Sequence, residues 1–158
     1  MEAGLSGEQG IVALNDEALD IVDWVHFEKN RADLGPGFIR ILSYFREDGA
    51  KSVGQIELAM HQENAAALVM PAHTIKGEAR QFGAEPLAQM AELIESTARL
   101  CVETHRFPDE LVASVVELRT LFEQTVSLFD QATNPLLTRD TASGFGRRAA
   151  ANQQFGRI

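Results

Sequence analysis

The chain has 158 residues, of which 45% are hydrophobic and 23% are charged, a composition typical of a globular protein with one domain-sized core. No apolar run approaches the roughly 20 residues that a membrane-spanning helix needs. The single cysteine excludes an intramolecular disulfide framework. The first ten residues lack the basic and apolar regions of a secretory signal, so we expect a cytoplasmic protein with no membrane association.

The net charge of -9 is unevenly distributed along the chain. Residues 132–158 contain four arginines and one aspartate, a net charge of +3, which leaves -12 on the rest. An acidic body repels the phosphodiester backbone, so we expect no nucleic-acid binding by the main domain. Residues 132–158 also lack an apolar stripe, and we predict a flexible basic tail there. Residues 1–20 contain few large apolar groups and are interpreted as a loose lead-in.

Helical periodicity starts just after this lead-in. Asp23 can cap a short helix from Trp24 to Leu34, which Gly35 ends. Pro36 then opens a second helix, whose apolar face continues to Met60. This second helix also contains two weak or bent points, Gly49 and Gly54.

Two further helices follow after short turns. Asn64 can cap the third helix, Gly83 ends it, and Pro86 opens the fourth. The apolar stripe of the third helix consists of Leu68, Ala72, Ile75, Ala79 and Phe82. That of the fourth consists of Leu87, Met90 or Ala91, Ile94, Ala98 and Cys101.

A break at Phe107-Pro108-Asp109 precedes a fifth helix. Its apolar positions are Leu111, Val115, Leu118, Phe122, Val126 and Phe129. No run alternates with period 2 for long enough to indicate a strand, and short connections favour antiparallel neighbours. We therefore predict an all-α protein, an up-down antiparallel four-helix bundle with a short N-terminal capping helix, over residues 21–131.

The chain has four histidines, and three of them have simple interpretations. His26 and His105 are most simply surface residues. His61 follows Glu57 by one helical turn, a spacing that can bind a metal on one helix face. One such pair is not a site, and the Glu-x-x-His motif of di-iron bundles is absent from the chain, so we expect no metal.

His73 lies on a different stripe from the core of its helix. At about 100° per residue, it points roughly 160° away from Ile75. Its own stripe consists of Val69, His73, Lys76, Gly77 and Arg80. Glycine inside a helix costs about 1 kcal/mol relative to alanine, and Pro71 removes a backbone donor. These helix-weakening residues favour a role for His73 other than stability, although a solvated helix face fits the bare geometry equally well.

The same helix contains Ala72-His73-Thr74-Ile75-Lys76-Gly77, followed by Phe82-Gly83. This run resembles the signature of histidine-containing phosphotransfer (HPt) domains, especially the form found in chemotaxis histidine kinases. Asn64 falls where an acidic or amide cap precedes the histidine helix of that family. The family's second signature is similar to Leu93-Ile94-Glu95. The resemblance covers about residues 20–131.

The resemblance implies a four-helix bundle whose exposed histidine carries a phosphoryl group. His73 would be the phosphoacceptor, Lys76 would meet the charge on the phosphoryl oxygens, and Glu95 would hold the imidazole. Gly77 would leave room for the phosphoryl group and for a partner, which would also dock against Val69 and Arg80. The sequence departs from the family pattern at Pro71 and at Glu78-Ala79-Arg80, which affects the shape of that docking surface.

These residue types suit phosphoryl transfer. A neutral imidazole is a good nucleophile near physiological pH, and the loose, in-line transition state needs mainly positioning and charge neutralisation. A lysine on the same face provides a mobile point charge. A carboxylate can fix the tautomer of the ring, although Glu95 also has the spacing of a simple surface pair with Arg99.

The function implied by the resemblance is that of a phosphorelay intermediate. It takes a phosphoryl group from an aspartyl-phosphate on one receiver domain and passes it to another receiver domain. We expect a monomeric phosphocarrier rather than an enzyme, because the chain has no Gly-rich phosphate loop or kinase motif. Its partners would be response-regulator receiver domains and a hybrid histidine kinase, and Mg²⁺ would belong to the receiver. The alternative is a helical interaction module that carries no phosphate and binds through the residues after Gln131.

Overall fold

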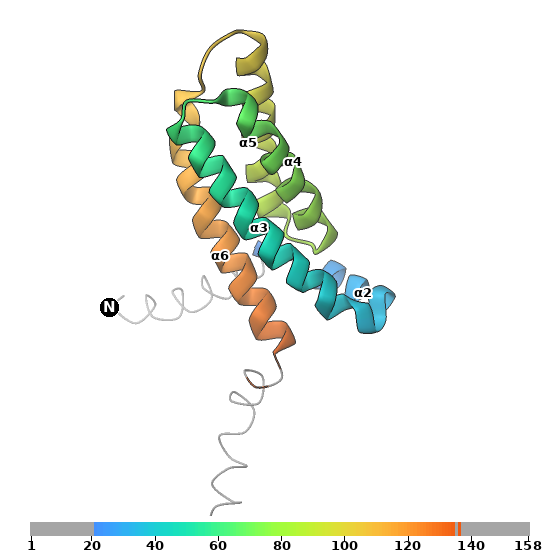
Figure 1. The fold of residues 1–158 in the computed structure, drawn as a ribbon. Coiled ribbons are helices and arrows are strands. Elements are labelled where there is room, and N and C mark those ends of the chain that lie inside the picture. Colours follow the sequence, from blue (N-terminus) through green and yellow to red (C-terminus); the bar gives the residue numbers. More distant parts are fainter. Residues whose placement is uncertain (1–20, 135, 137–158) are drawn as a thin grey trace, which may run out of the picture. The chain divides into compact units, whose positions relative to one another are not determined.

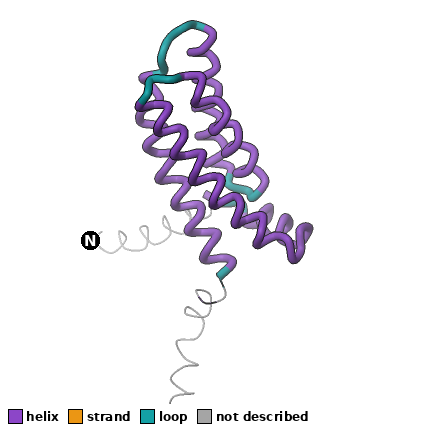
Figure 2. The backbone as a smooth tube through the Cα atoms, viewed as in Figure 1, coloured by secondary structure: helices purple, strands orange, loops and turns teal. Residues whose placement is uncertain are grey.

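The computed structural model describes residues 21–134 and residue 136, and every regular element in this part of the chain is helical (Figure 2). In chain order, the α-helices are α2 (Trp24–Leu34), α3 (Phe38–His61), α4 (Ala65–Gln81), α5 (Glu85–Glu103) and α6 (Val112–Thr133). Two short 3₁₀ helices, η1 (Gly35–Gly37) and η2 (Asp109–Leu111), precede α3 and α6. The all-α prediction is confirmed for the described residues.

By its contacts, the chain divides into two units, Met1–Val126 and Ser127–Ile158. The second unit contains the last turns of α6, where the Thr133 hydroxyl donates to the Phe129 carbonyl. The predicted lead-in over 1–20 and most of the predicted tail over 132–158 lie outside the described residues. The boundary that we draw after residue 131 stays a prediction.

The helix ends follow the capping residues in the sequence. The Asp23 carboxylate accepts from the backbone N–H of His26, and the Asn64 side chain accepts from that of Ala67. Each bond satisfies a backbone donor that the first turn of a helix leaves without a partner. Gly83 follows α4 with a φ of 80°, in the left-handed region that favours glycine. The predicted starts and stops are therefore correct to within a few residues.

The core of the first unit connects its helices through a chain of aromatic rings. Phe27 of α2 packs edge-on against Phe38 of α3, with ring centroids 5.2 Å apart. Phe82, which caps the end of α4, lies 5.9 Å from Phe38 and 5.4 Å from Phe45. Phe45 also packs 5.8 Å from Phe122 of α6. In Figure 1, α3, α4 and α5 run alongside one another, and α4 contacts both α3 and α5.

Gly49 of α3 contacts another helix. As predicted, α3 continues through this glycine, and the weak or bent point that we expect there stays a prediction. Gly49 is buried, and a Cβ built on it would lie 2.8 Å from Cζ of Phe122. This glycine is therefore explained by the close approach of an aromatic ring from α6. Gly54 is exposed and has no atom within 4 Å of its Cβ position.

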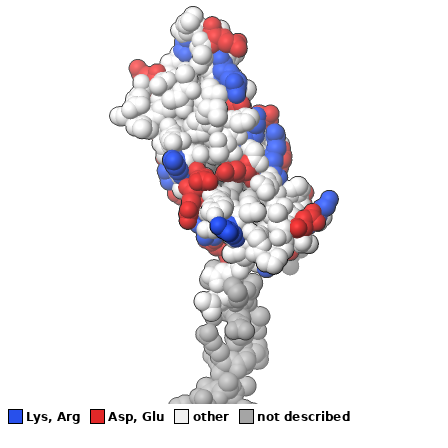
Figure 3. Space-filling view, turned by 45° about the vertical axis from the view of Figure 1, so that its right-hand side comes forward, with Lys and Arg blue, Asp and Glu red and all other residues white. Residues whose placement is uncertain are grey.

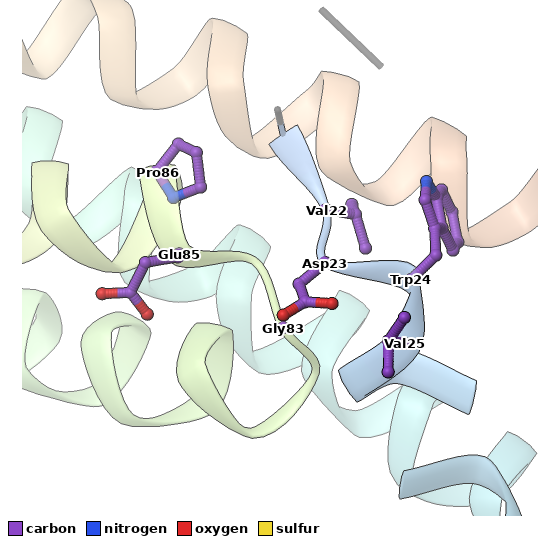
Figure 4. Close-up of a pocket in the computed structure, with 7 residues that line it drawn as sticks. All are labelled: Val22, Asp23, Trp24, Val25, Gly83, Glu85 and Pro86. Atoms are coloured by element: carbon purple, nitrogen blue, oxygen red, sulfur yellow. The ribbon is translucent and has the colours of Figure 1, made fainter. Parts of the chain in front are cut away.

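The start of α2 is bonded to the turn between α4 and α5. The backbone N–H of Asp23 donates to the Gly83 carbonyl at 2.8 Å, and a Cβ on Gly83 would lie 2.7 Å from the Asp23 carbonyl oxygen. The Asn30 amide also donates to the Gln81 carbonyl. Figure 4 shows Asp23 beside Gly83, at a shallow depression that Glu85 and Pro86 also line. Gly83 of the signature thus joins the start of α2 to the turn after α4, and Phe82 packs on α3, so both residues have structural roles.

Candidate functional site

His73 lies on the exposed side of α4, as its stripe predicts. Its side chain is 54% exposed, whereas Ala72 and Ile75 on either side of it are buried. The ring Nδ1 lies 3.0 Å from Oε1 of Glu95 on α5. Because an ionised carboxylate only accepts, Nδ1 carries the proton in this bond. Among the described residues nothing bonds to Nε2, which is therefore the ring nitrogen available to a reagent.

Glu95 is the buried centre of this site. Its side chain is only 7% exposed, and it contacts His73 and Lys76 from α4 and Arg99 from its own helix. Burial works to raise the pKa of Glu95, but the bonds from Lys76, Arg99 and His73 outweigh burial and lower this pKa to about 2. Glu95 is therefore ionised at neutral pH, as its role as acceptor for Nδ1 requires.

Lys76 lies nearer to α5 than its place on the exposed stripe suggests. Its side chain is only 20% exposed, and Nζ lies 2.6 Å from Oε2 of Glu95. In this state the ammonium group neutralises a carboxylate instead of pointing into solvent. The flexible stem of a lysine allows the ammonium group to reorient towards another anion nearby.

The three residues predicted for access and docking have different surroundings. Gly77 is exposed, and no atom lies within 4 Å of its Cβ position. Arg80 is bonded to α5, with Nη2 2.9 Å from Glu92 and Nε 3.6 Å from Glu85. Val69 is half-buried and lines a shallow depression between α4 and α5. The other residues that line it are Ala66, Arg99, Val102 and Glu103.

Pro71 does not interrupt the histidine helix. It is buried within α4, which continues from Ala65 to Gln81. Proline cannot donate to the carbonyl four residues earlier, so the hydrogen bond to Ala67 is missing from this helix. Two residues later, the helix already presents His73 to Glu95.

From the sequence, Glu95 has two alternative partners, His73 and Arg99. Both pairings are present in the structure. Arg99 donates to Oε1 through Nη2 at 2.9 Å and through Nε at 3.2 Å. This is the same oxygen that bonds to His73. The spacing of four residues between Glu95 and Arg99 was the available signal, but periodicity alone does not show that one oxygen serves both partners.

The other histidines lie outside this arrangement. His26, His61 and His105 are all exposed, and His26 bonds through Nε2 to the Gln81 carbonyl at 3.1 Å. Glu57, the partner considered for His61, accepts from Nε of Arg119 on α6 at 2.8 Å. Residues 21–134 contain no group of three or more His, Cys, Asp or Glu side chains that could hold a metal ion.

Comparison with known protein families shows the family to which the chain belongs. The sequence model of the Hpt domain matches residues 40–128, more than half of the chain and including His73, Lys76 and Glu95. The chain belongs to the Hpt domain family. Its function is accordingly that of a histidine phosphotransfer protein in a two-component phosphorelay.

A solved structure shares the fold of this Hpt domain. Histidine-containing phosphotransfer protein B (HptB) from Pseudomonas aeruginosa PAO1 matches with a TM-score of 0.62 at 23% sequence identity, over 71% of this chain and 93% of that one. The search of curated proteins finds no match. Within the described residues, no helix has the length and apolar character needed to cross a membrane.

Proposed function

We propose that His73 is the phosphoacceptor through which this Hpt domain passes phosphoryl groups between receiver-domain aspartates. The observation that carries the proposal is the exposed ring whose Nδ1 bonds to the ionised Glu95. This bond leaves the lone pair of Nε2 directed away from Glu95. In acceptance, Nε2 forms the bond to phosphorus while the bond to the aspartyl oxygen of the donor breaks and leaves a carboxylate.

Each neighbour has a defined role in this proposal. Glu95 fixes the tautomer and balances the positive charge that the ring gains when Nε2 is phosphorylated. Lys76 sits one turn from His73 and exchanges its contact with Glu95 for the incoming phosphoryl oxygens. Gly77 keeps the surface beside the ring free of side chains, which supports close approach of a partner.

We propose that the partner docks on the exposed face of α4 and on the α4–α5 depression that Val69 lines. Receiver domains of response regulators and a hybrid histidine kinase are the partners that this role requires. Arg80 would contribute at the edge of the face, where its bonds to Glu92 and Glu85 hold the guanidinium in place. The part of the surface drawn in Figure 3 has acidic and basic groups next to one another and no extended basic patch, which supports a protein partner over a nucleic acid.

The remaining details of this role are also proposals. The chain acts as a monomeric phosphocarrier that binds no ATP, and Mg²⁺ resides in the acidic pocket of the receiver. Its buried, free Cys101 suits a reducing cytoplasm. The long helices form an up-down antiparallel bundle that α2 caps, supported by the short connections after α3 and α4 and by the bond from Asp23 to Gly83.

A single substitution tests the assignment. His73→Gln removes the nucleophile at an exposed position, so we expect a folded chain that accepts no radiolabel from phosphorylated receiver domains of the source organism. His105→Gln, at another exposed histidine, is the matched control and should accept label at the wild-type rate. Label retained by His73→Gln would contradict the assignment. Efficient binding of receivers without any label on the wild-type chain would favour the interaction module instead.

A further inference from the structure

One carboxylate oxygen of Glu95 is shared between the nucleophile and an arginine. Oε1 lies 3.0 Å from Nδ1 of His73 and 2.9 Å from Nη2 of Arg99. The two nitrogens therefore lie no more than about 6 Å apart, the sum of these two distances. A full positive charge thus lies next to the ring without a direct bond to it.

The carboxylate has a second basic partner besides Arg99. Its other oxygen, Oε2, lies 2.6 Å from Nζ of Lys76, and the side chain is nearly fully buried. Lys76 reaches it from α4, the helix that also carries His73. What Arg99 adds is therefore mainly charge, because the position of the carboxylate is already set by burial and by Lys76.

The charged groups nearest the ring come from α4 itself and from α5. Lys76 lies on α4, and α5 contributes Glu95 and Arg99. Glu103 of α5 lines the depression beside Arg99. The next pair, Arg80 with Glu92, begins two turns after His73. On the α3 side, the charge of Asp48 acts on Glu78, five residues after His73 and on another face of the helix.

We propose that Arg99 is a positioning residue that acts on phosphotransfer through Glu95: it offsets the charge of the carboxylate and thereby opposes a second proton on the attacking Nε2 of His73. The inference rests on the proposed function of His73. A ring next to an ionised carboxylate gains a second proton readily, and that proton would occupy Nε2 and block the nucleophile. Arg99 opposes this protonation because it is a like charge close to the protonated ring.

Arg99→Met tests the inference, because it removes the charge and retains much of the apolar stem. The first readout is an NMR titration of the unphosphorylated chain. It gives the midpoint pH of the change in the His73 ring resonances. We expect this midpoint to rise by roughly 0.5 to 1 pH unit, the size of one partly screened charge at this distance. The second readout is the pH profile of acceptance from phosphoramidate, a small donor that needs no docking surface. At pH values where the rate still rises with pH, Arg99→Met should react about threefold to tenfold more slowly than the wild-type chain. At high pH the two rates should be equal.

Two further variants serve as controls. Arg106→Met removes an arginine of similar exposure that pairs with Glu110, four residues later, and not with Glu95, so both readouts should stay at wild-type values. Arg99→Lys retains the charge, so its midpoint should lie close to the wild-type value. A midpoint that stays in place or falls in Arg99→Met, or that rises equally in Arg106→Met, would overturn the inference.

The two readouts separate this inference from the proposed function. If the wild-type chain accepts phosphoryl groups on His73 but Arg99→Met leaves the NMR midpoint unchanged, the inference alone is wrong. If Arg99→Met shifts the midpoint but the wild-type His73 accepts no phosphoryl group from any donor, the proposed function is wrong and Arg99 has no role in transfer.

Discussion

Two glycines within long helices, Gly49 of α3 and Gly77 of α4, have opposite surroundings. A Cβ on Gly49 would collide with Phe122, whereas a Cβ on Gly77 would meet nothing within 4 Å. Each glycine costs its helix about 1 kcal/mol relative to alanine. The first is offset by close packing of α6 on α3. The second has no such contact, and it lies four residues after His73, where a partner would approach under the proposed function.

The largest effect that we expect from this comparison is the loss of transfer in Gly77→Leu. The new side chain would project beside His73, where a receiver must come within contact distance, so transfer from a phosphorylated receiver should fall roughly 100-fold. Stability should instead rise by up to about 1 kcal/mol, because leucine is a better helix former. Single-turnover transfer and thermal unfolding of the same sample measure the two effects.

Gly54→Leu is the matched control for this prediction. Gly54 is also an exposed helical glycine with open space around its Cβ position, and it lies one turn before Glu57, which bonds to α6. This variant should gain similar stability and transfer at the wild-type rate. Normal transfer in Gly77→Leu would mean that Gly77 is merely tolerated by its helix.

The opposite sign is expected for Gly49→Ala. The added methyl group must displace the Phe122 ring, which is buried and packs against Phe45, so the chain should lose roughly 1–3 kcal/mol of stability. Transfer measured below the unfolding transition should remain near the wild-type rate. Denaturant unfolding measures the loss, and an increase in stability would show that α3 and α6 can separate at little cost.

The smallest effect concerns Glu78, which directly follows Gly77 on α4. Its Oε2 is buried without a hydrogen bond among the described residues, and burial, together with the charge of Asp48, raises the pKa of this carboxyl above its ordinary 4.5. A raised pKa means that the ionised form destabilises the fold, and that this penalty develops as pH rises through 4.5. Glu78→Gln should therefore stabilise the chain at neutral pH.

The stability difference between Glu78→Gln and the wild-type chain should depend on pH, and this dependence is the control for the prediction. Below about pH 4, wild-type Glu78 is protonated in both the folded and unfolded states, so the advantage of the glutamine variant should disappear there. Thermal midpoints at neutral and acidic pH measure the difference. An advantage that persists unchanged at acidic pH would have to come from packing and not from charge.

The sequence predicts the helices well because their signals are local. Asp23, Asn64 and Gly83 mark helix ends through caps and a left-handed turn, which involve only neighbouring residues. The position of His73 off the core stripe follows from helical periodicity alone. The resemblance adds Glu95, whose distance from His73 in the chain gives no geometric signal.

The remaining features depend on contacts between helices, which one sequence does not specify. The pairing of Lys76 with Glu95 depends on the distance between α4 and α5. The sharing of Oε1 by His73 and Arg99 depends on the rotation of α5. Gly49 looks like a weak point in the sequence because Phe122, the residue that explains it, lies more than 70 positions later.

The most direct test of the account is to locate the phosphoryl group on the wild-type chain. The chain would be phosphorylated by a receiver domain of the source organism, digested at alkaline pH, which preserves phosphohistidine, and sequenced by mass spectrometry. The account predicts a phosphoryl group on His73 and on no other residue. A phosphoryl group on His26, His61 or His105, with His73 unmodified, would contradict it.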